Sequence, residues 1–374
     1  MPARSFFPFA LAIFLVPLAR ERLDSARWLA QAATKNASGA MEKPLFRFVQ
    51  VNDLHVQATE PAVKTARQQT YKHANEKARW VVEAIREGKV VPPCDLVVGV
   101  GDVIHGESLE RLEPDLGALR EILKPLRCPL YPVVGNHEVV QQERSPQHLQ
   151  PFRKAFGTAH TDYTFAYGGV LFVALNNSGA PSAEAARQRN ERLRDMLSAA
   201  RDQPKIVLCH VPLISLRDEA VLAKSFGFAS YRDHDPGTLG LIEEHRDTVI
   251  AVLSGHLHLT GMKQQNGVFH VSIAGTASYP CDIAVYEVFS DRIEVAVKQL
   301  PDRLAKSEAS IHGRQRHGRD FTDQEHRTPE EYQSGLAGER SFAIPLTGRK
   351  CPRAKSGSSG HVGACQETFQ PSLK

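Results

Sequence analysis

Residues 130–138 read Leu-Tyr-Pro-Val-Val-Gly-Asn-His-Glu. The first five residues predict a buried strand, and the chain then turns at Gly135 into three polar residues. An apolar strand that ends in Asn, His and Glu is difficult to explain by packing, because a buried polar group loses its hydration. The stretch therefore predicts a sheet whose strand ends carry functional side chains.

Similar polar clusters occur elsewhere in the chain, and four of the five follow a strand that we expect to be buried. The clusters are Asp53-Leu54-His55, Gly101-Asp102, Gly135-Asn136-His137-Glu138, Cys209-His210 and Gly255-His256-Leu257-His258. A single Asp or His in such a place is usually a turn cap or a core residue. Because α/β folds build sites at the carboxyl ends of strands, the repetition favours one shared site.

The segments around these clusters alternate between strand-like and helix-like patterns from Pro44 to about Leu300. The predicted helices are Tyr71–Glu87 and Ser182–Ala200. The predicted strands are Phe46–Val51, Leu96–Val100, Leu130–Val134, two arms of a hairpin within Tyr163–Asn176, Ile206–Leu208, Val249–Leu253, Val268–Ile273, Ala284–Phe289 and Ile293–Val297. Continuous apolar strands mixed with helices predict an α/β sandwich with helices covering the sheets.

Composition excludes several classes of protein. The chain has 374 residues, of which 42% are hydrophobic, so it is neither wholly disordered nor a multi-span membrane protein. Six Cys are too few for a disulfide scaffold of this length. Most of the net charge of +4 belongs to residues 301–374, which carry 12 Lys and Arg against 9 Asp and Glu. The rest of the chain is nearly neutral and has no evident platform for nucleic acid.

The two ends differ from the body, so we expect three regions: 1–40, 44–300 and 301–374. Phe6–Ala19 is an apolar run of 14 residues, which fits the core of a signal peptide better than a membrane span of about 20 residues. The cleavage site is poor, so an uncleaved membrane anchor or a docked helix is an open alternative. Export or membrane association is favoured over a cytoplasmic location.

The C-terminal region, 301–374, is rich in Arg, Gly, Ser, Gln and His. We expect a disordered tail on these grounds. The alternative is a short arm that docks through the apolar residues Phe342–Leu346.

The clusters supply seven candidate metal ligands with oxygen or imidazole nitrogen and no thiolate: Asp53, His55, Asp102, Asn136, His210, His256 and His258. This donor set suits Zn, Fe, Mn, Co or Ni better than a structural zinc site or a calcium site. Seven side chains are too many for one such ion and suit two if a carboxylate bridges. Two ions about 3.5–4 Å apart are a known device for cleaving phosphate esters.

The ordered motifs D-x-H, G-D, G-N-H-E, a lone H and G-H-x-H resemble those of the calcineurin-like metallophosphoesterase superfamily, over roughly Phe46 to Val297. That superfamily includes purple acid phosphatases and class III cyclic-nucleotide phosphodiesterases. The resemblance implies a four-layer α/β/β/α sandwich of two mixed sheets flanked by helices.

The resemblance also implies roles for individual residues. Ligands of the first metal would be Asp53, His55, Asp102 and His258. Ligands of the second would be Asp102, Asn136, His210 and His256, with Asp102 bridging. His137 would be the catalytic histidine, acting on the leaving oxygen as an acid, and Glu138 would support the loops.

Departures from the superfamily's patterns narrow the substrate class. Val56 follows His55, and Gly101–Gly106 lacks the arginine of the serine/threonine protein phosphatases, which argues against that branch. His105 stands where purple acid phosphatases carry their colour-giving tyrosine, so a purple enzyme is not expected. His105 is interpreted first as structural support, with a substrate contact as the alternative.

Two further residues have two interpretations each, and two others are possible substrate contacts. Cys209 is favoured as a packed core thiol over a nucleophile, and His234 as a solvated loop residue over one that overhangs the site. Tyr279 and Asp282 lie near a strand end and could touch substrate.

The leading hypothesis is therefore a dinuclear phosphohydrolase that cleaves phosphomonoesters or phosphodiesters with a metal-bound hydroxide and a histidine acid. Its cofactors would be two ions of Mn, Fe, Zn or Co, and its substrate a small phosphoester. The alternative is a metal-bearing scaffold of the same fold with no enzymatic activity.

Overall fold

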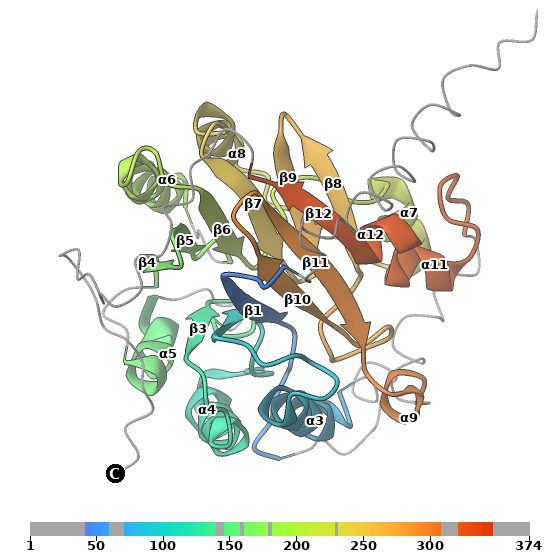
Figure 1. Ribbon diagram of the computed structural model, residues 1–374. Coiled ribbons are helices and arrows are strands. Elements are labelled where there is room, and N and C mark those ends of the chain that lie inside the picture. Colours follow the sequence, from blue (N-terminus) through green and yellow to red (C-terminus); the bar gives the residue numbers. More distant parts are fainter. Residues whose placement is uncertain are drawn as a thin grey trace, which may run out of the picture. The chain divides into compact units, whose positions relative to one another are not determined.

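The computed structural model describes residues 42–59, 71–139, 146–157, 161–178, 182–228, 231–307 and 321–346. Two six-stranded mixed sheets lie at the centre of this part of the chain (Figure 1). The first sheet has the order β12 (Ser341–Pro345), β11 (Arg292–Gln299), β10 (Asp282–Val288), β1 (Phe46–Val51), β2 (Leu96–Val100) and β3 (Leu130–Val133). The second has the order β4 (Tyr163–Tyr167), β5 (Val170–Leu175), β6 (Lys205–Cys209), β7 (Val249–Ser254), β9 (Val268–Ser272) and β8 (Gly261–Gln265).

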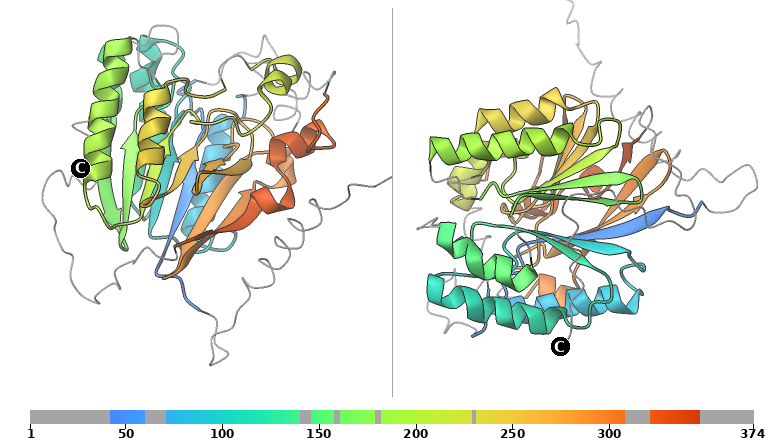
Figure 2. Two further views of the ribbon diagram at one scale, coloured as in Figure 1. Left: turned by 90° about the horizontal axis from the view of Figure 1, so that it is seen from above. Right: turned by 90° about the vertical axis from the view of Figure 1, so that its left-hand side faces the viewer.

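Helices cover the outer face of each sheet, which gives four layers (Figure 2). Beside the first sheet lie α3 (Ala74–Glu87), α4 (Leu109–Leu123) and α5 (Leu149–Phe156), which follows the short helix η1 (Pro146–His148). Beside the second lie α6 (Ala183–Ser198) and α8 (Pro236–Glu244). The remaining helices are α7 (Glu219–Phe226), α9 (Asp302–Ala305), α11 (Pro329–Ser334) and α12 (Ala337–Arg340). The predicted four-layer sandwich is confirmed.

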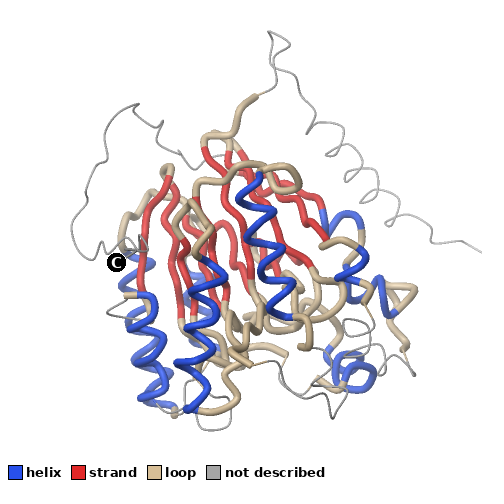
Figure 3. Tube along the Cα trace, turned by 90° about the horizontal axis from the view of Figure 1, so that it is seen from below, coloured by secondary structure: helices blue, strands red, loops and turns tan. Residues whose placement is uncertain are grey.

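The layers have separate apolar cores because successive side chains of a strand point to opposite faces of a sheet. On β5, Phe172 packs between the two sheets, whereas Val173 packs against the helices beside the second sheet. Strands buried on both faces are apolar throughout, which explains the unbroken runs in the sequence. Figure 3 shows these strands running side by side among the helices.

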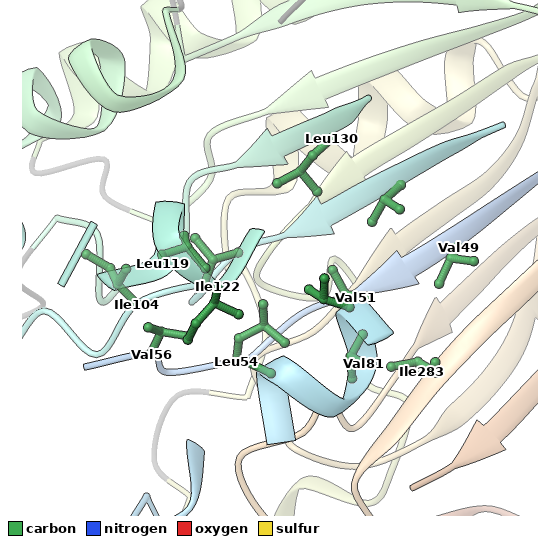
Figure 4. Packing of buried hydrophobic residues seen from close by; sticks show 14 of the residues in the cluster. Val49, Val51, Leu54, Val56, Val81, Ile104, Leu119, Ile122, Leu130 and Ile283 are labelled. Carbon is green, nitrogen blue, oxygen red and sulfur yellow. The ribbon is translucent and has the colours of Figure 1, made fainter. Parts of the chain in front are cut away.

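The core between the first sheet and its helices supports the ends of β1 and β2. In Figure 4, Val51 at the end of β1 lies beside Leu54 and beside Val81, which belongs to α3. Ile104, beyond the end of β2, belongs to the same cluster. Residues on either side of the polar loops are thus held in a close-packed interior, where small displacements are costly.

Two caps match their sequence signals. The helix predicted from Tyr71 begins at Ala74 and ends at Glu87, and it is capped by Gly88, whose φ of 67° is the left-handed conformation that glycine adopts readily. The hydroxyl of Ser182 accepts a hydrogen bond from Ala185 N at the start of α6. The sequence interpretation missed α4, although Leu112, Leu116 and Leu119 show helical spacing.

The expectation of a disordered tail is wrong for residues 321–346. They form α11, α12 and β12, and β12 pairs antiparallel with β11, so the alternative of a docking arm is correct for this segment. We call residues 321–346 the C-terminal arm. The arm folds because it buries Tyr332 completely and pairs a strand, which its polar composition concealed.

The apolar run Phe6–Ala19 and residues 308–320 and 347–374 of the predicted tail lie outside the described residues. Among the helices that are described, none has the length and apolar character needed to cross a membrane.

Candidate metal centre

The five polar clusters meet at one edge of the two sheets. Asp53, Asp102 and Asn136 follow β1, β2 and β3, which are parallel neighbours in the first sheet. His210 and His256 follow β6 and β7, which are parallel neighbours in the second. Since the carboxyl ends of neighbouring parallel strands share an edge, the topology brings together side chains that are far apart in the sequence.

One group of side chains that could hold a metal ion consists of Asp53, His55 and His258, all buried. Nε2 of His258 lies 3.1 Å from Oδ1 of Asp53 and 3.3 Å from Nε2 of His55. The other oxygen of Asp53, Oδ2, accepts hydrogen bonds from Asn52 Nδ2 (2.6 Å) and His256 N (3.0 Å). One oxygen therefore holds the loop while the other faces two imidazoles.

A second group consists of Asp102, His210 and His256, also buried. Nε2 of His210 lies 3.1 Å from Oδ2 of Asp102 and 3.1 Å from Oδ1 of Asn136. Nδ1 of His256 lies 2.9 Å from the same Asn136 oxygen. Asn136 thus joins this group through its amide oxygen.

Asp102 lies between the two groups. Its Oδ2 is 3.1 Å from His210 Nε2 in the second group and 3.7 Å from His55 Nε2 in the first. This is the position that a bridging carboxylate requires. The structure therefore brings all seven candidate ligands together around Asp102.

The donor atoms fit transition-metal ions. Oδ1 of Asp53 is buried and makes no hydrogen bond among the described residues, although a carboxylate oxygen in the interior needs a partner. Each group combines carboxylate oxygen with imidazole nitrogen, a donor set that Mn, Fe, Zn and Co all accept. Either group could supply the protein ligands of one such ion.

The ionisation of the two candidate carboxylate ligands also suits metal binding. Burial alone would raise the pKa of Asp53, but the neighbouring His258 outweighs it and holds that pKa well below its usual range. Burial likewise opposes ionisation of Asp102, and His210 outweighs it, so the pKa of Asp102 is lowered as well. Both carboxylates therefore stay ionised.

The backbone is strained at this centre. Five of the seven candidate ligands have a positive φ: Asp53 (47°), His55 (47°), Asp102 (49°), His256 (69°) and His258 (50°). Such conformations are uncommon for residues other than glycine and gather at functional sites. The sequence motifs do not reveal this feature.

Glycines allow the loops to approach one another closely. A Cβ on Gly101 would lie 2.3 Å from Nδ1 of His210, and a Cβ on Gly135 would lie 2.2 Å from Asp102 N. Neither position has room for a side chain. The glycines of the motifs are therefore required by contact with the candidate ligands.

Glu138 joins the loop after β2 to the loop after β3. Its carboxylate is buried and accepts hydrogen bonds from the backbone N–H groups of Asp102 (3.0 Å), Ile104 (3.1 Å) and Gly135 (2.6 Å). Burial, together with the charge of Asp102, raises the pKa of Glu138 to about 8. Its role is to hold backbone, as the sequence interpretation expected.

His137 borders both groups and is more exposed than the candidate ligands, with 11% of its side chain accessible. Its backbone N–H donates to Oδ1 of Asp102 (2.9 Å), and its Nδ1 donates to the carbonyl oxygen of His105. Nε2 lies 3.9 Å from Oδ2 of Asp102. The accessible nitrogen therefore lies next to the place where the two groups meet.

Other residues singled out in the sequence have structural roles. Cys209 is fully buried, and its thiol donates to Val211 O (3.5 Å). His234 is exposed, and its ring lies 5.7 Å from that of Tyr231. Asp282 does not face the centre: it is buried in an ion pair with Arg340 (2.8 Å), so its suggested contact with substrate is wrong.

Three neighbours of the centre carried no signal in the sequence. The ring centroid of Tyr71 lies 4.6 Å from that of His55, and the ring of Phe228 lies 5.3 Å from that of His256. Ser278 Oγ lies 3.0 Å from Nδ1 of His258. Each comes from a segment outside the motifs, so only the tertiary structure could find it.

Comparisons with known proteins agree with this architecture. The family model for the calcineurin-like phosphoesterases matches residues 46–259. A dimetal phosphatase from Danio rerio is similar in structure, with a TM-score of 0.54, 16% identity, and coverage of 69% of this chain and 97% of that one. The purple acid phosphatase PPD1 from yellow lupin (Lupinus luteus) has a TM-score of 0.52 and 13% identity, over 84% of this chain and 57% of that one. At these identities the likeness shows a shared fold. No curated protein matches the chain.

Proposed function

Because the chain belongs to the calcineurin-like phosphoesterase family, we propose that it hydrolyses phosphoester bonds with the help of two transition-metal ions. The observation that carries the proposal is the position of Asp102, whose Oδ2 faces His210 of one donor group and His55 of the other. Paired ions, when bound, lower the pKa of a water molecule and stabilise the charge that develops on a phosphoryl group.

Under this proposal the first ion would be held by Asp53, His55, Asp102 and His258, and the second by Asp102, Asn136, His210 and His256. Hydrogen bonds to the backbone and the packed cores fix the loops that carry these side chains. A site that is ordered in advance loses little conformational entropy on binding.

His137 is the proposed acid. Its Nδ1–H is engaged with the carbonyl oxygen of His105, so the ring is oriented and Nε2 is left to face the reacting group. A proton on Nε2 would pass to the leaving oxygen as its bond to phosphorus breaks. Such acid catalysis contributes about 10²–10⁴-fold to the rate.

The substrate is a small phosphoester, and the monoester and diester alternatives give different results in one assay. The purified chain is stripped of metal, reloaded with Mn²⁺, Zn²⁺, Fe²⁺ or Co²⁺, and tested with p-nitrophenyl phosphate and bis-p-nitrophenyl phosphate. Cyclic nucleotides and glycerophosphodiesters extend the panel.

We expect metal-dependent hydrolysis of at least one substrate, with two ions bound per chain. If the chain binds two ions and hydrolyses nothing in the panel, the proposal fails and the scaffold alternative replaces it.

A further inference from the structure

In His55, His210 and His258, the ring nitrogen that faces away from the donor groups lies near a hydrogen-bonding partner. Nδ1 of His210 lies 3.0 Å from the carbonyl oxygen of Val100, and Nδ1 of His258 lies 3.0 Å from Oγ of Ser278. For His55 the partner is another imidazole: its Nδ1 lies 3.4 Å from Nδ1 of His105. A histidine that binds a metal through one nitrogen is commonly oriented by a hydrogen bond from the other.

The positions of the protons follow from these contacts. Nε2 of His55 faces the first donor group, 3.8 Å from Oδ1 of Asp53, so a metal ligand there requires this nitrogen to be unprotonated. The proton of neutral His55 must then lie on Nδ1 and be donated to His105. Nδ1 of His105 is consequently the acceptor, and the proton of that ring lies on Nε2.

Glu107 completes the chain of contacts. Its Oε1 lies 2.9 Å from Nε2 of His105, so it accepts the proton that the previous step places there. The His105 side chain is only 4% exposed, whereas that of Glu107 is 53% exposed. A carboxylate at the surface is thereby linked through one buried imidazole to a candidate metal ligand.

His105 also contacts His137, the proposed catalytic acid. Its carbonyl oxygen accepts the hydrogen bond from Nδ1 of His137, and its ring is stacked on that of His137 with centroids 5.1 Å apart. The ring of Tyr71 packs against His105 with centroids 4.6 Å apart. One residue therefore orients both a candidate ligand and the candidate acid.

We propose that His105, held by Glu107, is a positioning residue that sets the tautomer and orientation of His55 toward the first metal ion. The inference rests on the proposed function, because it assigns His55 to a metal. It goes beyond support by packing alone, since it requires the two ring nitrogens of His105 and not only the volume of the ring.

The test measures metal affinity without substrate. Binding of Mn²⁺ is followed by calorimetry and bound metal by elemental analysis, and Co²⁺ reports ligand geometry through its visible spectrum. His105→Phe keeps a ring between Tyr71 and His137 but has neither acceptor nor donor. We expect it to weaken one of the two sites by about 10–100-fold, to spare the other and to change the Co²⁺ spectrum.

Two variants of Glu107, whose side chain is exposed, separate the effect of hydrogen bonding from that of packing. Glu107→Ala should weaken the same site, and Glu107→Gln, which keeps an acceptor oxygen, should restore most of the affinity. His270→Phe is the matched control, because His270 is a buried imidazole on β9 whose Nδ1 has no hydrogen bond among the described residues. It should leave both affinities unchanged.

Wild-type affinity at both sites in His105→Phe, with an unchanged Co²⁺ spectrum, would overturn the inference. If His105→Phe does not fold, unchanged affinity in Glu107→Ala overturns it instead. A wild-type chain that binds no metal overturns both proposals. A chain that binds two ions and hydrolyses nothing overturns only the proposed function, because the metal affinities of the wild type and the variants can still be compared without any turnover.

Discussion

Nε2 of His210 lies 3.1 Å from Oδ2 of Asp102, although Asp102 follows β2 of the first sheet and His210 follows β6 of the second. The contact joins the two sheets at the edge where the polar loops meet. Burial opposes protonation of His210, but Asp102 outweighs it and raises the pKa of His210 to about 10. The apolar core between the sheets brings the two side chains together, and the centre therefore depends on the packing of both sheets.

His137→Ala should lower kcat by about 10²–10⁴-fold while two ions remain bound. The reason is that His137 contacts Asp102 through its backbone N–H, which alanine retains. Turnover and metal content are measured on the same preparation. Loss of metal together with turnover would assign His137 a structural role in place of an acid role.

Asp102→Asn should reduce bound metal from two ions per chain to one or none. The replacement has the same shape but removes the charge that faces both donor groups. Elemental analysis after dialysis gives the metal content. Asp162→Asn is the control: Asp162 is a nearly buried carboxylate that bonds Asn176 N and Arg192 away from the centre, and two ions should remain.

Gly101→Ala should weaken metal binding and destabilise the fold. Gly101 has φ 80°, a region that costs other residues about 1–2 kcal/mol, and the added Cβ would meet the His210 ring. Gly117→Ala in α4 has open space around its Cβ and should be neutral or slightly stabilising. Urea unfolding compares the stability of the two variants, and titration with Mn²⁺ compares their metal affinity. Equal stability and equal affinity in the two variants would refute the steric argument.

Tyr332→Ala should destabilise the protein by about 3 kcal/mol or more, because the ring is fully buried in the C-terminal arm. It stacks on Phe226 of α7 with centroids 4.9 Å apart. Tyr332→Phe loses only the hydroxyl bond to Asp218 O (3.2 Å) and should cost about 1 kcal/mol. Free energies of unfolding in urea test both, and a negligible change in the alanine variant would mean that the arm is not docked in solution.

Stability should depend on pH through His326 of the arm, whose two ring nitrogens face carboxylates. Nδ1 lies 2.7 Å from Asp323 Oδ2, and Nε2 lies 3.3 Å from Glu339 Oε2. Burial opposes protonation, but the bond to Glu339 and the contact with Asp323 outweigh it, so the pKa of His326 is raised above 6.5. A group with a raised folded-state pKa stabilises fully below its unfolded pKa and loses that contribution as pH rises.

The free energy of unfolding should therefore fall in the wild type, relative to His326→Gln, as the pH rises above about 6.5. Glu339 acts at the other end of the pH range. Burial would raise its pKa, but His326 and Arg217 lower it to about 2, so its contribution is lost as pH falls from 4.5 toward 2. Urea unfolding over a pH series measures both limbs, and parallel curves for the two proteins above pH 6.5 would contradict the assignment.

The arm also shows where sequence reasoning failed. Arg217, between β6 and α7, pairs with Glu339 of α12 (2.6 Å) and donates to the carbonyl oxygen of Thr260 (2.7 Å). Thr260, which lies two residues after His258, in turn donates its backbone N–H to the carbonyl oxygen of Gln333 (2.7 Å). Composition predicted disorder because it cannot register partners this distant in the chain.

The strands and the ligand set, by contrast, could be predicted from local sequence. β1 and β2 have the predicted bounds, since strands buried on both faces appear as unbroken apolar runs. Asp53, Asp102 and Asn136 could be named as candidates because each stands within three residues of the end of such a strand, where parallel neighbours bring their loops to one edge.

The sequence by itself thus determined the layered fold and the identity of the donor residues, because both depend on periodicity and on residue types at strand ends. Only the tertiary structure decided which candidate ligands have a positive φ, and that His105 contacts both His55 and His137. These features depend on contacts between loops of separate strands and, for Asp102 and His210, of separate sheets. Such contacts exist only once the packed cores have brought the two sheets together.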